Sequence, residues 1–117
     1  MPTEMNRRTD VYLALGRLET ALADAELWTE EAPPPERMGS SQPFSFDTLS
    51  CGQWLQWQFI PRMRALIEHG EPLPASCAIH PYAEEALRGH EQDIAEVLLV
   101  IRELDTLISG QSPDATH

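Results

Sequence analysis

The chain has 117 residues, of which 42% are hydrophobic and 23% are charged, a balance that excludes collagen-like and wholly disordered chains and indicates one soluble folded domain. Nineteen acidic residues stand against eight basic ones, all of them arginine, which gives a formal net charge of -11 at pH 7. Basic side chains supply most of the non-specific affinity of proteins for nucleic acids. This charge therefore disfavours direct nucleic-acid binding and favours a basic protein partner, unless it serves solubility alone.

The sequence also bears on the compartment in which the protein works. No stretch reaches the roughly 20 consecutive apolar residues that a membrane-spanning helix requires, and no export signal is recognisable. The two cysteines, Cys51 and Cys77, are too few for a disulfide framework and lack the spacing of a metal site. We therefore expect a cytoplasmic protein without membrane contact, in which both thiols are reduced.

The first predicted helix covers about residues 8–27, where apolar residues recur at steps of three and four. Several alanines in this segment add helix propensity. The spacing places one face of the helix toward a core, and the residues on that face are Val11, Leu15, Leu18, Leu22 and Ala25.

Residues 28–47 lose this periodicity and are predicted to form a long loop between the first two helices. Three successive prolines, Pro33 to Pro35, exclude helix from the middle of the segment. A loop of about 20 residues without secondary structure is uncommon inside a compact domain. We therefore expect it either to be mobile or to be ordered by packing through Phe44 and Phe46.

A second helix is predicted to begin after Ser50, which forms a capping box with Gln53. It runs to His69, and Gly70 supplies the left-handed residue that ends it. Pro61 lies inside this helix. Because proline has no N–H and its ring crowds the preceding turn, we expect a kink there, or two abutting helices.

The last third of the chain predicts two more helices. A short one covers 82–88, with Pro81 before it and Gly89 after it, and a long one covers about 91–109, closed by Gly110. The apolar face of the long helix is formed by Ile94, Val97, Leu98, Ile101, Leu104 and Ile108.

The predicted elements together specify an all-α fold. No segment alternates with the period of two that a strand requires. Amphipathic helices bury their apolar faces on one another, so we expect a small antiparallel helical bundle of three long helices and one short helix. Residues 1–110 form the single domain, with the long loop at least partly ordered, and 111–117 form a frayed tail.

Trp54 and Trp57 lie off the apolar face of the second predicted helix. On a helical wheel that face centres about 170° from Trp54, so both indoles point away from the bundle core. One interpretation is that the loop folds back and that Pro43, Phe44 and Phe46 cover the indoles. The other is that loop and helix frame a binding cleft in which the indoles supply apolar area.

Polar residues around the two tryptophans suit such a cleft, and they are Gln42, Asp47, Gln56, Gln58 and Arg62. For Arg62 two interpretations stay open. Its guanidinium group either receives a carboxylate or phosphate, or forms a salt bridge to Asp47 that fastens the loop. The predicted binding residues are Gln42, Phe44, Asp47, Trp54, Trp57, Gln58 and Arg62.

Four runs of aromatic, proline and glutamine residues stand out, namely Ser41-Gln42-Pro43-Phe44, Trp54-Leu55-Gln56-Trp57, Ile60-Pro61-Arg62-Met63 and Pro72-Leu73-Pro74. In this order they resemble the YqcC-like family, which comprises small bacterial helical proteins of unknown function. The resemblance covers roughly residues 8–108 and departs from the family pattern at Cys51, where a proline is expected. It implies an all-helical bundle, and it supplies no catalytic residues that could be assigned to this sequence. Because some relatives are encoded beside or fused to a pseudouridine synthase acting on tRNA, it also implies an accessory role beside that enzyme.

The sequence has no arrangement typical of an active site. Nucleotide-binding, hydrolase and kinase motifs are missing, and the four histidines are spread along the chain without metal-ligand spacing. Cys51 lies at a helix start, where its pKa could be lowered, but it is also a small residue suited to a half-buried position. We therefore expect no catalytic residue, metal or cofactor, and a non-enzymatic interaction protein. The alternative is a small-molecule or anion-binding protein that uses Trp54, Trp57 and Arg62.

Overall fold

The structure is a computed structural model that describes the backbone of residues 3–109 and the side chains of residues 7–109. All regular structure in this part of the chain is helical, as predicted. The elements are α1 (Thr3–Asp24), α2 (Pro35–Met38), η1 (Pro43–Ser45), α3 (Cys51–Trp54), η2 (Leu55–Phe59), α4 (Ile60–Glu68), α5 (His80–Ala86) and α6 (Ala95–Ser109). Within the described residues, none of these helices combines the length and apolarity needed to cross a bilayer. The predicted stop at Gly110 and the tail 111–117 lie outside the described residues.

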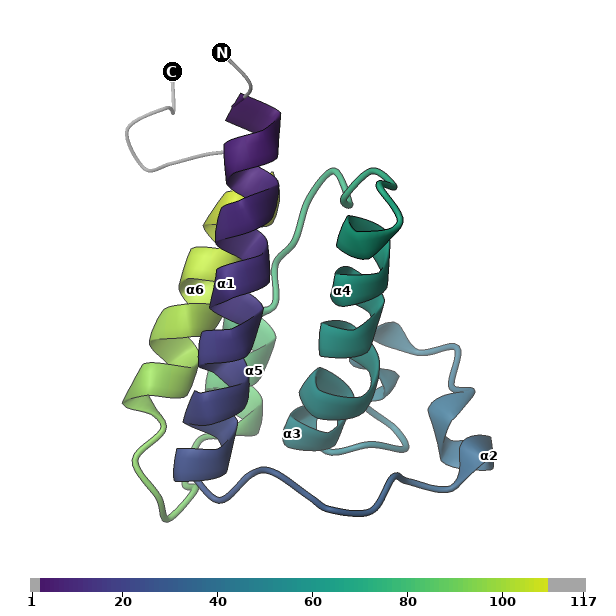
Figure 1. Cartoon of the computed structure of the whole chain (residues 1–117). Coiled ribbons are helices and arrows are strands. Elements are labelled where there is room, and N and C mark those ends of the chain that lie inside the picture. The colour runs from purple at the N-terminus through teal and green to yellow at the C-terminus, as the bar shows by residue number, and fades with distance from the viewer. Residues whose placement is uncertain (1–2, 110–117) are drawn as a thin grey trace.

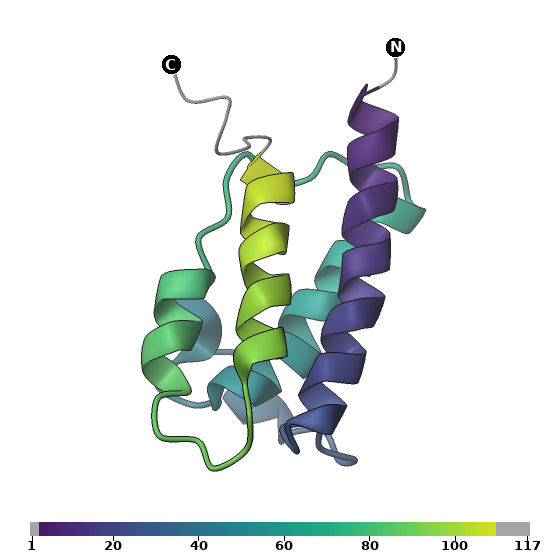
Figure 2. The ribbon, with the colours of Figure 1, turned by 90° about the vertical axis from the view of Figure 1, so that its left-hand side faces the viewer.

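α1 and α6 lie side by side and run in opposite directions, as Figures 1 and 2 show from two sides. The predicted apolar face of α1 is confirmed, since Val11, Leu15, Leu18, Leu22 and Ala25 are each at most 1% exposed. The fully buried residues of α6 are Val97, Val100, Ile101, Leu104 and Ile108. Ile94 and Leu98, predicted to share that face, are only half-buried. The core therefore centres on the α1–α6 pair, and burial of its aliphatic side chains is the main source of stability.

Residues 51–68 form one unbroken helical stretch made of α3, η2 and α4. The predicted capping box is confirmed, because the Gln53 N–H donates to Ser50 Oγ at 3.2 Å and the Ser50 N–H donates to Gln53 Oε1 at 3.1 Å. At the other end, Gly70 has a φ of 69°, the left-handed conformation expected of it. Both ends of this helix follow from the sequence.

Pro61 is accommodated by a change of helix type. The five residues before α4 form the π-helical turn η2, in which the Ile60 N–H donates to the carbonyl of Leu55, five residues earlier. A proline has no N–H and crowds the carbonyl four residues before it, here that of Trp57. The wider turn relieves this conflict, so the disturbance expected at Pro61 takes the form of a π-helical turn in a continuous helix.

The loop between α1 and α3 contains two short helical elements, α2 and η1. The prediction that the three prolines exclude helix is therefore wrong. Pro35 is the first residue of α2, where a backbone N–H would have no helical partner and where the fixed φ of proline favours a helix start. Figure 1 shows the loop leaving the end of α1, passing α2 and returning to α3.

Two helix starts in the last third differ from the sequence prediction. α5 begins at His80 rather than at residue 82, and α6 begins at Ala95 rather than near residue 91. The reason for the second shift is a cap, because Asp93 Oδ1 accepts a hydrogen bond from the Ala95 N–H at 2.9 Å. α5 ends at Ala86 rather than at residue 88, and Gly89, in the turn that follows, has a φ of 84°.

Arg7 and Arg8 of α1 hold the C-terminal ends of the two neighbouring long helices. Arg7 Nη1 donates to the carbonyl oxygen of Ile108 in α6 at 3.1 Å. Arg8 donates to the carbonyls of Leu66 at 3.0 Å and Glu71 at 2.8 Å, at the end of α4. A cation is favourable at a helix C-terminus, where the last carbonyls lack helical partners. Adjacent arginines thereby join α1 to both α6 and α4.

We expect Arg8→Ala to lower the free energy of unfolding by about 1–2 kcal/mol, because it removes charge-assisted hydrogen bonds to backbone carbonyls. Urea unfolding followed by circular dichroism measures this change. The matched control is Arg102→Ala, since Arg102 is exposed on α6 and has no hydrogen bond among the described residues. Equal stability of the two variants would contradict the capping role of Arg8.

Candidate functional site

A groove of about 1000 Å³ lies along one face of the helix 51–68, bounded by that helix, by loop residues 38–44 and by the connector 72–79. Five predicted binding residues line it, and they are Phe44, Trp54, Trp57, Gln58 and Arg62. Gln42 and Asp47 do not line it and are exposed in the loop. The structure therefore brings most of the predicted residues together at one surface.

Gln56 does not face the groove, although Trp54, Trp57 and Gln58 do. Its side chain is only 6% exposed and pairs with the backbone of Thr29 at the start of the loop. Gln56 Nε2 donates to the Thr29 carbonyl at 2.6 Å, and the Thr29 N–H donates to Gln56 Oε1 at 2.8 Å. A buried amide needs such partners because an unpaired polar group in the interior is costly. Gln56 thus fixes the first part of the loop.

Trp57 and Gln58 also fasten the loop to the helix. The Trp57 indole N–H donates to Thr29 Oγ1 at 2.9 Å. Gln58 Nε2 donates to the Met38 carbonyl at 2.6 Å, and Gln58 Oε1 accepts from Ser45 Oγ at 2.9 Å. Three consecutive residues of the π-helical turn therefore contact the loop at three points. Trp57 and Gln58 line the groove, but their polar atoms are already engaged within the protein.

Four aromatic side chains form a cluster at one end of the groove. Phe44 packs edge-on against Trp54 at 5.1 Å between ring centroids and stacks on Tyr82 of α5 at 4.4 Å. Trp54 stacks on Phe59 at 5.4 Å. The loop thus covers Trp54 through Phe44, whereas Phe46, expected to help, is 57% exposed. Such ring pairs stabilise beyond the apolar area that they bury.

Phe44 reaches this cluster through an unusual backbone conformation. It has a φ of 58° and the next residue, Ser45, has a φ of 47°, both in the left-handed region. Residues with a side chain adopt this region at a cost of about 1–3 kcal/mol and keep it only where surrounding contacts enforce it. The ring contacts of Phe44 and the hydrogen bond of Ser45 to Gln58 supply that enforcement.

Arg62 lies exposed on the groove and is not bound to Asp47. The Asp47 carboxylate instead accepts a hydrogen bond from Ser40 Oγ at 2.6 Å. The interpretation in which a salt bridge between Arg62 and Asp47 fastens the loop is therefore wrong. Among the described residues, the Arg62 guanidinium group has neither a hydrogen bond nor an ion pair. The loop is held by the glutamines of the π-helical turn, which leaves this cation available to an external group.

Both cysteines are free, but neither resembles a nucleophile. Cys51 is 4% exposed, and burial raises its pKa to about 12, so the lowering considered for a helix start is wrong. Burial also raises the pKa of Cys77, as does its hydrogen bond to Asp105. Across the described residues, no three His, Cys, Asp or Glu side chains gather closely enough to hold a metal ion.

In the folded protein we expect the Cys51 thiol to react with iodoacetamide at pH 8 about a thousandfold more slowly than free cysteine. The thiolate is the reactive form, and a pKa of about 12 makes it scarce at that pH. Timed labelling followed by peptide mass spectrometry measures the rate. In concentrated guanidinium chloride the rate should rise to that of free cysteine. Rapid labelling of Cys51 without denaturant would show that its site is accessible.

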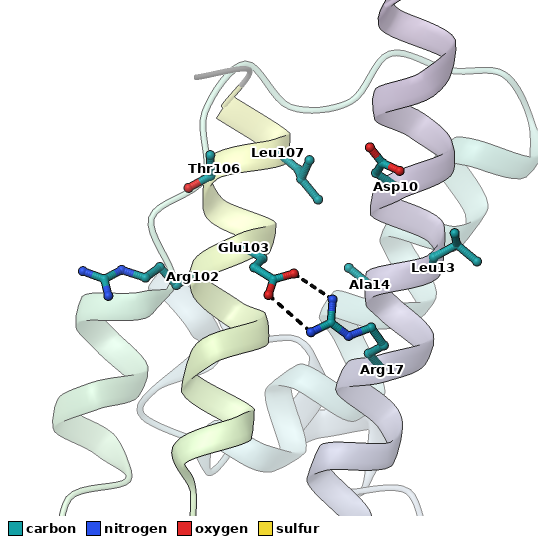
Figure 3. A pocket seen from close by; sticks show the side chains of 8 residues that line it. All are labelled: Asp10, Leu13, Ala14, Arg17, Arg102, Glu103, Thr106 and Leu107. Carbon is teal, nitrogen blue, oxygen red and sulfur yellow. Dashed lines mark hydrogen bonds and ion pairs between the residues drawn. The ribbon is translucent and has the colours of Figure 1, made fainter. Parts of the chain in front are cut away.

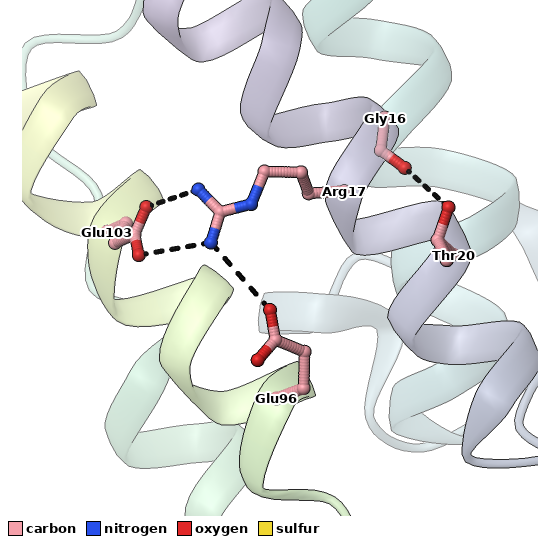
Figure 4. A network of polar contacts seen from close by, with 5 residues as sticks. All are labelled: Gly16, Arg17, Thr20, Glu96 and Glu103. Carbon is pink, nitrogen blue, oxygen red and sulfur yellow. Dashed lines mark hydrogen bonds and ion pairs between the residues drawn. The ribbon is translucent and has the colours of Figure 1, made fainter.

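A second cavity, of about 580 Å³, lies between α1 and α6 (Figure 3). Arg17 crosses it and donates to both carboxylate oxygens of Glu103, at 2.7 and 3.3 Å. Figure 4 shows that the same guanidinium group also reaches Glu96, at 3.7 Å. All three side chains are at least partly exposed, so these ion pairs contribute little to stability. This cavity contains none of the predicted binding residues.

The chain is similar in sequence to one protein family and to proteins of two bacteria. The family model described as "DUF446: tRNA pseudouridine synthase C" matches residues 10–107. The chain is 37% identical over 108 residues to "Uncharacterized protein YqcC" of Escherichia coli (strain K12), covering 92% of this chain and 99% of that one. It is 42% identical over 92 residues to an "Uncharacterized protein" of Haemophilus influenzae, covering 77% of this chain and 87% of that one.

Two further comparisons concern a longer protein and a solved structure. The chain is 40% identical over 72 residues to "tRNA pseudouridine synthase C" of Pectobacterium carotovorum, which covers 62% of this chain but only 19% of that protein. The solution NMR structure of protein YqcC from E. coli is similar with a TM-score of 0.77 and 35% identity, covering 95% of each chain. The fold is therefore shared with an experimentally determined structure.

Proposed function

The chain belongs to the YqcC-like family, and from this premise we propose that it is a non-enzymatic interaction protein that associates with a tRNA pseudouridine synthase. The proposal rests on the small share of the Pectobacterium protein that is similar to this chain. The similar segment forms only 19% of a protein named tRNA pseudouridine synthase C. It is thus one part of a longer chain in that organism. The similar segment makes up nearly all of the E. coli relative and only part of the Pectobacterium protein, so such a segment is suited to contact the enzyme whether or not it is covalently joined to it.

The surface of the chain supports association with a protein. Its net charge of -11 attracts a basic partner and accelerates their encounter. Two large aromatic side chains on the loop, Trp28 and Phe46, are 40% and 57% exposed. Aromatic residues are enriched at the centres of protein interfaces, where they supply rigid apolar area. The partner in this proposal is therefore a basic enzyme surface, and the chain itself makes no direct contact with tRNA.

The proposal assigns no catalytic step to this chain. Cys51 has a thiol that is buried and protonated at neutral pH, and the carboxylate of Asp105 is engaged by the backbone N–H groups of Ile79 and His80 at 2.9 and 2.8 Å. These groups hold the fold together and are not presented to a substrate. We place the protein in the cytoplasm, where tRNA is modified.

Affinity purification of the tagged chain from its native cells tests the proposal. The bound proteins are quantified by mass spectrometry after nuclease treatment, which excludes bridging by tRNA. We expect the tRNA pseudouridine synthase to be enriched at low salt and depleted at high salt, because ions screen exposed charges. The control bait is the tag alone. No enrichment of the synthase at either salt concentration would contradict the proposed function.

A further inference from the structure

The groove carries a positive charge, whereas the protein as a whole is strongly acidic. Asp and Glu outnumber Arg by 19 to 8 in the whole chain, yet among the described residues the only charged side chain lining the groove is that of Arg62. The accessible apolar part of the lining includes Trp54 and Leu66 on the helix and Pro74 on the connector. A surface of this kind favours an apolar occupant with one anionic group.

The neighbouring arginines show why Arg62 is the available cation. Arg64, two residues later, donates to both carboxylate oxygens of Glu19 at 2.7 Å. Arg8 caps the carbonyls at the end of α4. Arg62 has no such partner within the described chain, and its planar guanidinium group offers paired donors that match a carboxylate.

The dimensions of the groove indicate an elongated occupant. Its lining on the helix extends from Trp54 to Leu66, and twelve residues at the rise of an α-helix span about 18 Å. An extended peptide of about five or six residues has this length. The connector forms another part of the lining, and Pro72 and Pro74 keep it out of helix. The groove therefore follows one long helix and is completed by the connector and by part of the loop.

We infer that this groove binds an extended segment of a partner protein, with apolar side chains against Trp54 and Leu66 and one Asp or Glu carboxylate on Arg62. A phosphorylated segment fits less well. It carries about two negative charges, a single arginine faces it, and the protein is strongly acidic. The inference names the chemistry of the docking segment, and it depends on the proposed function only for the identity of the partner.

A phage-displayed library of random heptapeptides, selected on the immobilised full chain, tests this inference. We expect the enriched peptides to carry Asp or Glu beside aromatic or aliphatic residues. For the best synthetic peptide, exchange of its acid for the amide should weaken binding about tenfold in fluorescence anisotropy. In Arg62→Gln the two peptides should bind equally, and the melting temperature should equal that of the parent because Arg62 has no internal partner.

Arg102→Gln is the matched control, since Arg102 is also exposed but lies outside the groove. It should keep the preference for the acidic peptide. Enrichment of basic peptides, enrichment of no peptide, or an acid preference that survives Arg62→Gln would overturn the inference. Binding of phenylbutyrate as tight as that of the peptide would assign the groove to a small carboxylate and overturn it as well. The peptide selection uses this chain alone, so its failure would not contradict the proposed association with the synthase. Failure of the synthase to bind would likewise not contradict peptide binding in the groove.

Discussion

Gln56→Ala is expected to lower the free energy of unfolding by about 2–4 kcal/mol, although glutamine is an uncommon determinant of stability. The substitution removes both hydrogen bonds between the Gln56 amide and the Thr29 backbone. It also leaves the Thr29 N–H and carbonyl without these partners beside an apolar side chain. Urea unfolding monitored by circular dichroism gives the change in stability.

The control for this prediction is Gln42→Ala. Gln42 is exposed in the same loop, and no hydrogen bond of its side chain is found among the described residues. Its substitution should change stability by less than about 0.5 kcal/mol. Hydrogen exchange adds a local readout, because loss of the Gln56 contact should expose the Thr29 amide. Parental stability of Gln56→Ala would mean that the loop is held in another way.

Trp54→Ala is expected to destabilise the protein by about 3 kcal/mol, because removal of a large packed ring leaves a cavity and exposes its partners. Phe44 then loses the ring that it packs against edge-on at 5.1 Å, and Phe59 loses its stacking partner. The strained backbone at Phe44 loses part of its support. Thermal and urea unfolding should both show the loss.

Trp28→Ala is the matched control for Trp54→Ala. The Trp28 indole is 40% exposed and has no ring contact among the described residues. Its removal should cost about 1 kcal/mol or less. Equal effects of the two substitutions would show that the aromatic cluster around Phe44 contributes nothing specific to stability.

Much of the fold is predictable because short-range sequence patterns determine where some helices begin and which faces they bury. The apolar spacing of α1 and the capping box at Ser50 specify helix face and helix start without long-range contacts. Gly70 follows the helix end in the predicted left-handed conformation because few other residues adopt that conformation without strain. The helix that begins at Pro35 was not predicted, because proline excludes helix at most positions. Pro35 begins a helix at the one position that tolerates proline.

The candidate site is predictable in composition but not in the roles of its residues. The tryptophans and Arg62 do share one surface, but the sequence could not show that Asp47 bonds to Ser40 instead of Arg62. Gln56 carried a signal that was missed. At 100° per residue it lies about 200° from Trp54, close to the centre of the apolar face. A glutamine at that position must be buried and paired, which is its state in the structure.

Titration calorimetry of the purified chain with the purified tRNA pseudouridine synthase of the same organism, without tRNA, measures the proposed association most directly. We expect a one-to-one complex with a dissociation constant of about 10 µM or tighter, which weakens as salt is raised. Arg102→Gln should bind as the parent does. Absence of binding with both proteins at about 100 µM would contradict the proposal.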